Sequence, residues 1–305
     1  MSAVWIVGCG YVGERVARAE QAAGARVVAL VRSTETVARL AAHGIASLHA
    51  DLDDPASLAV LPTAGTFLYY FAPPPASGVS DTRLGNFLAA LTQPPAHVVL
   101  ISTTGVYGDC QGEWVTEDRT PRPVADRARR RLDAEQRLRV WGQAHAVSVA
   151  ILRVPGIYGP GRLPVQRLEA GEPVLRESES PWSNRVQVDD LVRACLAARA
   201  GRANGVYNIS DGHPSTMTDY FNRVADAVGL PHPPQITRAE AQTVLSDGMR
   251  SYLAESKRLD NRRMREELGV EPLYPDLAQG LAACVAAREP EETGSGPRRR
   301  TGEAG

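Results

Sequence analysis

The sequence predicts an α/β protein built on a doubly wound parallel sheet, with a smaller C-terminal lobe. Two observations support this prediction. Short β-branched apolar runs alternate with helix-like segments through the first half of the chain, which is typical of βαβ units. A glycine-rich turn also joins the first apolar run to a helical pattern. With 305 residues, of which 43% are hydrophobic, the chain can bury a core of this size, and whole-chain disorder or a collagen-like structure is excluded.

Six apolar runs are the expected strands of the sheet, and the segments between them are candidate crossover helices. Because parallel strands are buried on both faces, their runs are expected to be almost continuously apolar. The expected strands are Val4–Val7, Arg26–Val31, Ala46–Ala50, Thr66–Phe71, His97–Ser102 and Val147–Val154. The candidate helices lie near residues 11–23, 34–43, 55–61, 80–92 and 122–146.

The regular alternation stops after Pro155, which marks the expected boundary between two parts of the chain. A stretch rich in glycine and proline follows at 156–161, and the irregular sequence after it suits a substrate loop. The last residues lack apolar side chains to bury, so they should form a disordered tail. The predicted parts are a first domain at 1–154, a substrate lobe at 155–288 in which 186–210 return to the first domain, and the tail at 289–305.

Regular elements resume in the second half. We expect a helix over Asp189–Ala200 and a strand over Val206–Ile209. A further helix should begin at Thr216, which has Asp219 at capping-box spacing, and end at Gly229 before a proline. The sequence therefore predicts two helices and one strand in this half of the chain.

Composition excludes several classes of function. The 34 basic and 35 acidic residues give a net charge of −1, so no overall field would attract nucleic acid or a membrane surface. With no membrane-spanning run and no leader-like start, we expect a cytoplasmic location. Cys9, Cys110, Cys195 and Cys284 lack the spacing of a disulfide framework or a metal site. Lys257 is the only lysine, which excludes mechanisms that need a lysine elsewhere.

The glycine-rich turn predicts a phosphate cradle. Gly8, Gly10 and Gly13 form a G-x-G-x-x-G motif between the first strand and the first helix, and Tyr11 and Val12 begin that helix. The first glycine permits a tight turn, the second lets the backbone approach a pyrophosphate, and the third lets the helix pack closely. The helix N-terminus adds N–H donors. The motif predicts dinucleotide binding; the alternative is a glycine-rich turn without a cofactor.

The end of the second strand favours NADP(H) over NAD(H). An NAD site usually has an acidic residue there to bind the ribose hydroxyls, but this chain has Arg32, and the next acid is Glu35. A guanidinium pairs well with a 2′-phosphate. The alternative is that Arg32 is one more solvated arginine. Asp51, which ends the third strand, is a candidate acceptor for the adenine amino group or a helix cap before Pro55.

The fifth strand leads into a motif that resembles a known family. Residues 102–108 read S-T-T-G-V-Y-G, residues 158–161 read Y-G-P-G, and residues 188–191 read V-D-D-L. Together with the glycine motif, this order resembles the extended and atypical short-chain dehydrogenase/reductases, the NAD-dependent epimerase/dehydratase group, over residues 3 to about 285. The resemblance implies a Rossmann domain that binds NAD(P). It also implies that Thr103 holds a substrate oxygen and that Pro155 lies beside the nicotinamide.

The chain departs from this family at the Y-x-x-x-K motif, whose tyrosine is the acid/base. The resemblance places Arg127 at the tyrosine position and Arg131 at the lysine position. Arginine keeps its proton near neutral pH, so it can stabilise an oxyanion but cannot act as an acid/base. The i, i+4 spacing puts both on one helix face, where they are candidate catalytic or cofactor-contacting groups. The alternative is a solvated arginine face, which Arg129 and Arg130 favour.

Two further arginines are candidates for an anionic substrate. Arg162 and Arg185 lie in the second lobe, and guanidinium groups match phosphates such as those of a nucleotide-sugar diphosphate. One hypothesis is an NADP(H)-dependent oxidoreductase or epimerase/dehydratase-like enzyme with an unusual proton donor and a small-molecule substrate. The other is a sensor or regulatory protein that binds NADP(H) without catalysis. The sequence leaves the oligomeric state open, a homodimer included.

Overall fold

The computed structural model describes residues 3–58, 61 and 63–287, so the predicted tail at 289–305 lies outside the described residues. A sheet of seven parallel strands forms the centre of the molecule and confirms the predicted fold class. The strand order is β12-β7-β5-β4-β1-β2-β3, with a change of direction beside β1. The strands are β1 (Ala3–Val7), β2 (Arg26–Val31), β3 (Ala46–His49), β4 (Phe67–Tyr70), β5 (His97–Thr103), β7 (Ser148–Val154) and β12 (Gly205–Asn208).

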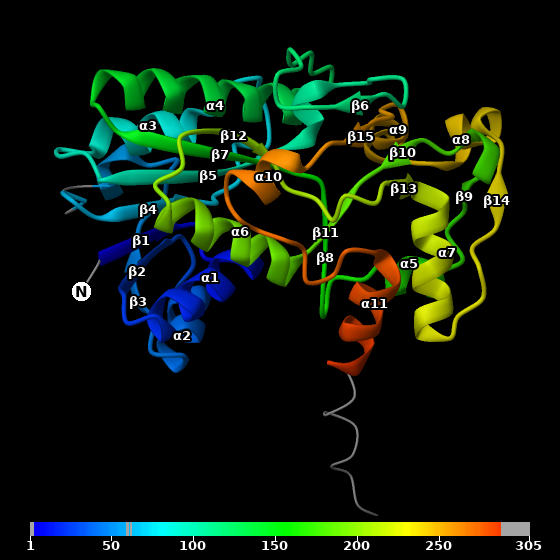
Figure 1. The fold of residues 1–305 in the computed structure, drawn as a ribbon, viewed down its shortest axis with the longest axis horizontal. Coiled ribbons are helices and arrows are strands. Elements are labelled where there is room, and N and C mark those ends of the chain that lie inside the picture. The colour runs from blue at the N-terminus through cyan, green and yellow to red at the C-terminus, as the bar shows by residue number, and fades with distance from the viewer. Residues whose placement is uncertain (1–2, 59–60, 62, 288–305) are drawn as a thin grey trace, which may run out of the picture.

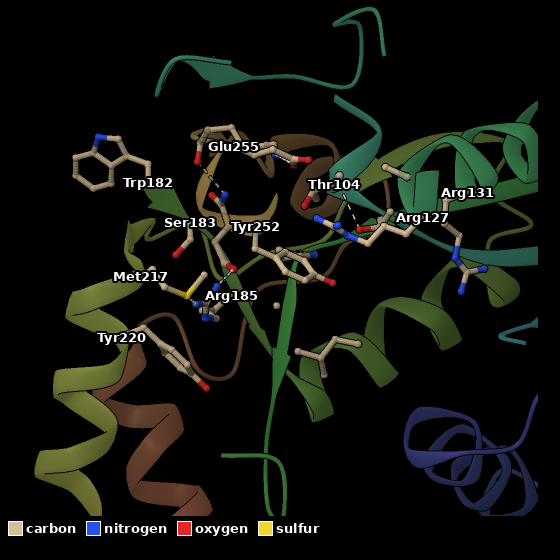
Figure 2. Close-up of a pocket in the computed structure, with 18 of the residues that line it drawn as sticks. Thr104, Arg127, Arg131, Trp182, Ser183, Arg185, Met217, Tyr220, Tyr252 and Glu255 are labelled. Atoms are coloured by element: carbon tan, nitrogen blue, oxygen red, sulfur yellow. Dashed lines mark hydrogen bonds and ion pairs between the residues drawn. The ribbon is translucent and has the colours of Figure 1, made fainter. Parts of the chain in front are cut away.

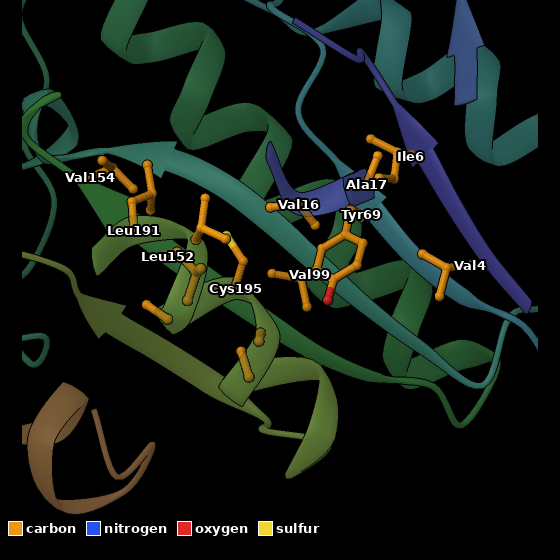
Figure 3. Close-up of a cluster of buried hydrophobic side chains, with 14 of the residues drawn as sticks. Val4, Ile6, Val16, Ala17, Tyr69, Val99, Leu152, Val154, Leu191 and Cys195 are labelled. Carbon is orange, nitrogen blue, oxygen red and sulfur yellow. The ribbon is translucent and has the colours of Figure 1, made fainter. Parts of the chain in front are cut away.

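Helices cover both faces of this sheet (Figure 1). Alternate side chains of β1 point to opposite faces: Val4 and Ile6 pack on one side, Trp5 and Val7 on the other. Figure 3 shows the first of these clusters, in which Val4 and Ile6 lie with Val16 of α1 and Cys195 of α6. One face carries α1 (Tyr11–Ala22), α2 (Thr34–Ala42) and α6 (Val188–Ala200), and the other carries α3 (Thr82–Ala90) and α4 (Asp126–Ala144).

The second lobe has its own small core. Tyr158, Leu168, Phe221 and Leu281 are buried together between its helices. Helix α7 ends at Gly229, whose φ of +70° is the left-handed conformation expected of a helix-terminating glycine. The elements are β8 (Gly156–Tyr158), α5 (Val165–Glu169), β9 (Val174–Leu175), η3 (Glu177–Glu179), β10 (Trp182–Ser183), β11 (Arg185–Gln187), β13 (Ser215–Thr216), α7 (Met217–Val228), β14 (Gln235–Ile236), α8 (Arg238–Val244), α9 (Asp247–Leu253) and α11 (Leu277–Ala286).

The chain crosses between the two parts more than once. Helix α6 packs on the sheet and β12 pairs in parallel with β7, within the segment 186–210. A second return, which sequence reasoning did not anticipate, follows α9. There β15 (Arg258–Leu259) pairs with β6 (Trp114–Val115), and Met264 of α10 (Arg262–Glu266) joins the core on the sheet. Residues of the 250s are therefore held close to the first domain.

Three local expectations were wrong. Within the predicted helix at 55–61, the described residues Pro55–Leu58 form a 3₁₀ turn, η1, rather than an α-helix, because the Ser57 hydroxyl bonds to the carbonyls of Asp51 and Asp54. Helix α4 begins at Asp126 rather than near 122, because Pro123 disfavours helical geometry at the residue before it.

The third concerns the capping box expected at Thr216. The Thr216 side chain does cap α7, but the Asp219 carboxylate pairs with Arg223 rather than completing the box.

Another turn, η2 (Thr104–Tyr107), follows β5. Among the helices that the structure describes, none combines the length and the apolar character needed to cross a membrane.

Candidate functional site

A cavity of about 540 Å³ lies at the carboxyl ends of β1, β2 and β3, where ligands bind in open α/β sheets. We call it the cofactor cavity. All the residues predicted for the cofactor line it except Pro155, which lies in the neighbouring cavity described below. Those that line it are Gly8, Gly10, Tyr11, Val12, Gly13, Arg32 and Asp51.

The glycine motif has the geometry of a phosphate cradle. Gly8 has a φ of +90°, and a Cβ there would lie 2.5 Å from the backbone nitrogen of Ala72. A Cβ on Gly13 would lie 2.7 Å from the carbonyl oxygen of Gly8, so the helix packs as closely as predicted. A Cβ on Gly10 meets no atom within 4 Å, which leaves open space in front of the helix. The cradle therefore fits the pyrophosphate of a dinucleotide.

The N-terminus of α1 supplies donors to this space. The first backbone bond of the helix runs from the Glu14 N–H to the Gly10 carbonyl at 2.9 Å. The N–H groups of Tyr11, Val12 and Gly13 therefore have no partner within the helix. Gly10 offers no side-chain cap, so these donors are free for an anion.

The rim of the cofactor cavity carries two arginines. Arg32 is 65% exposed at its side chain, and its nearest carboxylate, on Asp53, is 4.0 Å away. Arg39, which the sequence did not single out, lines the same cavity and pairs with Glu14. One oxygen of Asp51 accepts a bond from the backbone of Asp53 at 2.9 Å, which closes a turn. Arg32 is thus placed where the ribose-directed acid of an NAD site would lie.

A second cavity of about 540 Å³ adjoins the first, and we call it the substrate cavity. Arg131 and Ile157 line both cavities, so the two spaces meet there. Thr103, Arg127, Pro155 and Arg185 also line the substrate cavity, and Figure 2 shows several of its side chains. The Thr103 oxygen accepts a bond from the Gly105 N–H at 3.2 Å, which leaves the Thr103 hydroxyl proton free for a ligand.

The two arginines of α4 face inward. Arg131 donates to the carbonyl of Ala72 at 3.2 Å, and burial lowers the pKa of its guanidinium. Arg127 donates to the Ser251 hydroxyl at 2.8 Å and lies 3.9 Å from the centre of the Tyr252 ring. The structure therefore places both groups on the cavities rather than on a solvated face.

Arg185 is a buried cation at the other end of the substrate cavity. It is 8% exposed, and burial lowers the pKa of its guanidinium. It donates to the carbonyl of Asn184 at 2.8 Å and lies 4.1 Å from the centre of the Tyr220 ring. Within the described residues it forms no ion pair with a carboxylate. A buried charge without a counter-ion is costly, which suits a site that takes an anion.

Arg162 lies apart from Arg185. It lines the cofactor cavity, 4.6 Å from the centre of the Tyr11 ring, and it does not line the substrate cavity. The hydroxyl of Tyr11 donates to the carbonyl of Pro160 at 2.9 Å. These contacts tie the loop after β8 to the start of α1, so Arg162 faces the cofactor cavity rather than the predicted substrate position.

Sequence reasoning missed the residues of the segment 252–257 that line the substrate cavity. Tyr252, Glu255 and Lys257 line it, and no local sequence motif predicts that they do. The Lys257 ammonium donates to Glu255 at 2.7 Å, and both side chains are nearly buried. The only lysine therefore lies in the site, far in sequence from the helix where the family motif would have one. The sequence shows that the chain has a single lysine, but it does not show that this lysine lies in the substrate cavity.

A buried polar network beneath the site was also missed. Glu135 of α4 accepts bonds from Ser102 of β5 and from Arg153 of β7, with an Arg153 Nη2 to Glu135 Oε2 distance of 2.7 Å. Arg153 lies 4.7 Å from the ring centre of Tyr107, whose hydroxyl donates to Asn208 of β12. Tyr107 is 1% exposed and lines neither cavity, and burial raises its pKa to about 12, so this phenol is a buried structural residue and not the cavity-wall residue that the sequence suggested. The network holds the strands that carry the site.

Comparisons with known proteins agree with this geometry. The Escherichia coli K12 protein YeeZ is 32% identical over 191 residues, which are 62% of each chain, so the match spans about three fifths of that relative. A 3-diazoavenalumate denitrifying reductase from Streptomyces sp is 29% identical over 43% of this chain and 45% of its own. A solved structure of a conserved protein of unknown function from Silicibacter pomeroyi DSS matches 95% of this chain and 100% of its own, with a TM-score of 0.81 and 29% identity.

The model of one family matches residues 4–210. That range holds the phosphate cradle, the seven strands of the sheet and most of both cavity walls. On this match over more than half of its length, the chain belongs to the NAD-dependent epimerase/dehydratase family.

Proposed function

We propose that this chain is a cytoplasmic NADP(H)-dependent oxidoreductase or epimerase/dehydratase-like enzyme that acts on a small anionic substrate. The observation that carries the proposal is Arg185, a buried guanidinium that forms no ion pair with any carboxylate of the described residues, in a cavity that opens onto the cofactor cavity. A substrate anion on Arg185 would supply the missing counter-charge. When bound, the dinucleotide would supply or accept a hydride at the junction of the two cavities.

The charge of the substrate cavity supports an anionic substrate. Four arginines and one lysine line it, against a single carboxylate on Glu255. Guanidinium groups bind phosphate and carboxylate through paired hydrogen bonds. Aromatic side chains add flat apolar walls, which suit the base or ring of a larger molecule. A phosphate-bearing molecule such as a nucleotide-sugar diphosphate has both features. The aromatic walls are Trp182, Tyr220, Phe221 and Tyr252.

The preference for NADP(H) rests on the rim of the cofactor cavity. Arg32 is exposed and only loosely paired, so its guanidinium can turn to a 2′-phosphate. Ser33, Thr36 and Arg39 line the cavity beside it and add donors. Hydrogen bonds to charged groups contribute roughly 1.5–3 kcal/mol each, which is about tenfold or more in affinity.

A sensor without catalysis is the second candidate, and the arginines of α4 favour it. Arg127 and Arg131 occupy the places that the resemblance gives to the acid/base and its lysine, and neither can release a proton near neutral pH. Such a protein would bind NADP(H) and an anion and respond to their concentrations. An enzyme and a sensor would both use the substrate cavity, so only a measurement of turnover separates the two hypotheses.

The test measures NADPH oxidation with a set of aldehydes and ketones that includes 4-carboxybenzaldehyde. With UDP-glucose and dTDP-glucose, which carry hydroxyl groups and no free carbonyl, it measures NADP⁺ reduction and the formation of an epimerised or dehydrated sugar. Turnover that Thr103→Ala removes, in a protein that still binds NADPH, would support the enzyme. Tight NADPH binding without turnover of any compound would favour the sensor. A calorimetric titration with UDP tests the anion site separately, and Arg185→Met should abolish UDP binding without weakening NADPH binding. Equal UDP binding by the variant would contradict the role of Arg185.

A further inference from the structure

Most ionisable side chains in the substrate cavity cannot move a proton near neutral pH. Arg127, Arg131 and Arg185 are guanidinium groups, which stay protonated near neutral pH in proteins. Lys257 and Glu255 are held in their own ion pair at 2.7 Å, with side chains only 7% and 12% exposed. Proton transfer therefore needs another group.

Two phenols line this cavity, and they differ in access. Tyr220 is 7% exposed, belongs to the core of the second lobe and lies under Arg185, and burial raises its pKa. Tyr252 is 54% exposed, and among the described residues no hydrogen bond engages its hydroxyl. Figure 2 shows the Tyr252 side chain reaching from α9 across the cavity toward Arg127. Tyr252 is thus the phenol that a bound molecule can reach.

Arg127 holds this phenol in place. Its guanidinium lies 3.9 Å from the centre of the Tyr252 ring, and its Nη1 donates to the preceding residue, Ser251, at 2.8 Å. Two contacts on consecutive residues fix the end of α9 against α4. The guanidinium also keeps its positive charge beside the ring, so it stabilises the negative charge that remains when the phenol gives up its proton.

We propose that Tyr252 is the proton donor and acceptor of this site, supplied by α9 to stand beside Arg127. The inference rests on the proposed enzymatic function. In the reducing direction, bound NADPH would supply a hydride to a substrate carbonyl carbon, and the C=O π pair would move to oxygen. That oxygen takes the proton of Tyr252, and water returns a proton to the phenolate. The net reaction joins a carbonyl compound, NADPH and one proton to give an alcohol and NADP⁺.

The test uses Tyr252→Phe, which keeps the ring over Arg127 and removes only the hydroxyl. With NADP⁺ bound, the affinities of 4-(hydroxymethyl)benzoate and 4-methylbenzoate are compared by calorimetry. The parent should prefer the hydroxymethyl compound about tenfold, because a hydroxyl placed between Thr103 and Tyr252, which both line the cavity, would bond to both. Tyr252→Phe should lower this preference at least about threefold, the effect of one hydrogen bond. Reduction of 4-carboxybenzaldehyde should slow by about 100-fold or more.

Tyr274→Phe is the matched control, because Tyr274 lines neither cavity. It should keep both the preference and the rate. An unchanged preference or rate in Tyr252→Phe, or no preference in the parent, would overturn the assignment of Tyr252. Failure of both benzoates to bind to the parent would overturn the anionic substrate site itself, and the inference about Tyr252 with it. Unchanged NADPH affinity in all variants shows that the cofactor cavity is intact.

Discussion

Gly10→Val separates cofactor binding from folding more cleanly than the other changes in the phosphate cradle. A Cβ on Gly10 meets no atom within 4 Å, although its φ of −91° and ψ of −148° lie outside the regular α and β regions. The fold should therefore tolerate valine without a clash, at a backbone cost of about 1–3 kcal/mol in the free energy of unfolding. Gly8→Ala is unsuitable, because its Cβ would clash with Ala72 and its φ is positive.

The size of the effect on binding follows from the free N–H groups of α1. Three of them face the space that the isopropyl group of valine would occupy. Displacing a pyrophosphate from two of these donors removes roughly 1.5–3 kcal/mol for each charged hydrogen bond. We therefore expect the Kd for NADPH to rise by about 10² to 10⁴.

The measurement pairs a fluorescence titration of NADPH with urea unfolding of the same protein. Gly201→Val is the control, since Gly201 caps α6 at a φ of −79° and lines neither cavity. It should leave the Kd for NADPH unchanged. A folded Gly10→Val protein that binds NADPH within about threefold of the parent would refute the phosphate cradle as we describe it.

Three other perturbations follow from the structure. Arg32→Ala should bring the ratio of NADPH to NADH affinity from about tenfold or more to near one, and an unchanged ratio would contradict the role of Arg32. Glu135→Gln leaves Arg153 buried without its carboxylate, so urea unfolding should show a loss of about 3–5 kcal/mol, and a loss under about 1 kcal/mol would show that the pair is not structural. Burial raises the pKa of Asp211 to about 7. The folded protein then binds more protons than the unfolded chain between about pH 4 and pH 7, so its stability falls as the pH rises through this window. Asp211→Asn should remove that fall in urea unfolding at pH 5 and pH 7.5, and a fall of the same size in the variant would count against the buried carboxyl.

The sequence predicted the sheet well because its strands are local features. Each strand is a short apolar run whose ends are set by nearby glycine, proline or polar residues, and β2 has the predicted bounds at Arg26–Val31. The phosphate cradle is local too, since one turn between β1 and α1 holds all of its glycines. Where a single hydroxyl competes with the backbone, as Ser57 does in η1, the local pattern was not enough.

Other features depended on contacts between distant residues. Tyr252 meets Arg127 across 125 positions of the chain, and Asn208 accepts from Tyr107 across 101. Only packing of the second lobe against the first can decide such pairs, because a pattern of neighbours contains no information about which surfaces meet. The same holds for Arg162, which packing turned toward the cofactor cavity.

The sequence by itself determined the fold class, the phosphate cradle and the loss of the Y-x-x-x-K motif, because each is encoded in residues a few positions apart. The tertiary structure alone decided which other side chains line the cavity beside the substituted motif. It buried Arg185 with no ion pair to a carboxylate among the described residues, and it brought Lys257 and Tyr252 to the substrate cavity. Catalytic geometry is set by the approach of separate elements, and that approach depends on the packing of the whole chain.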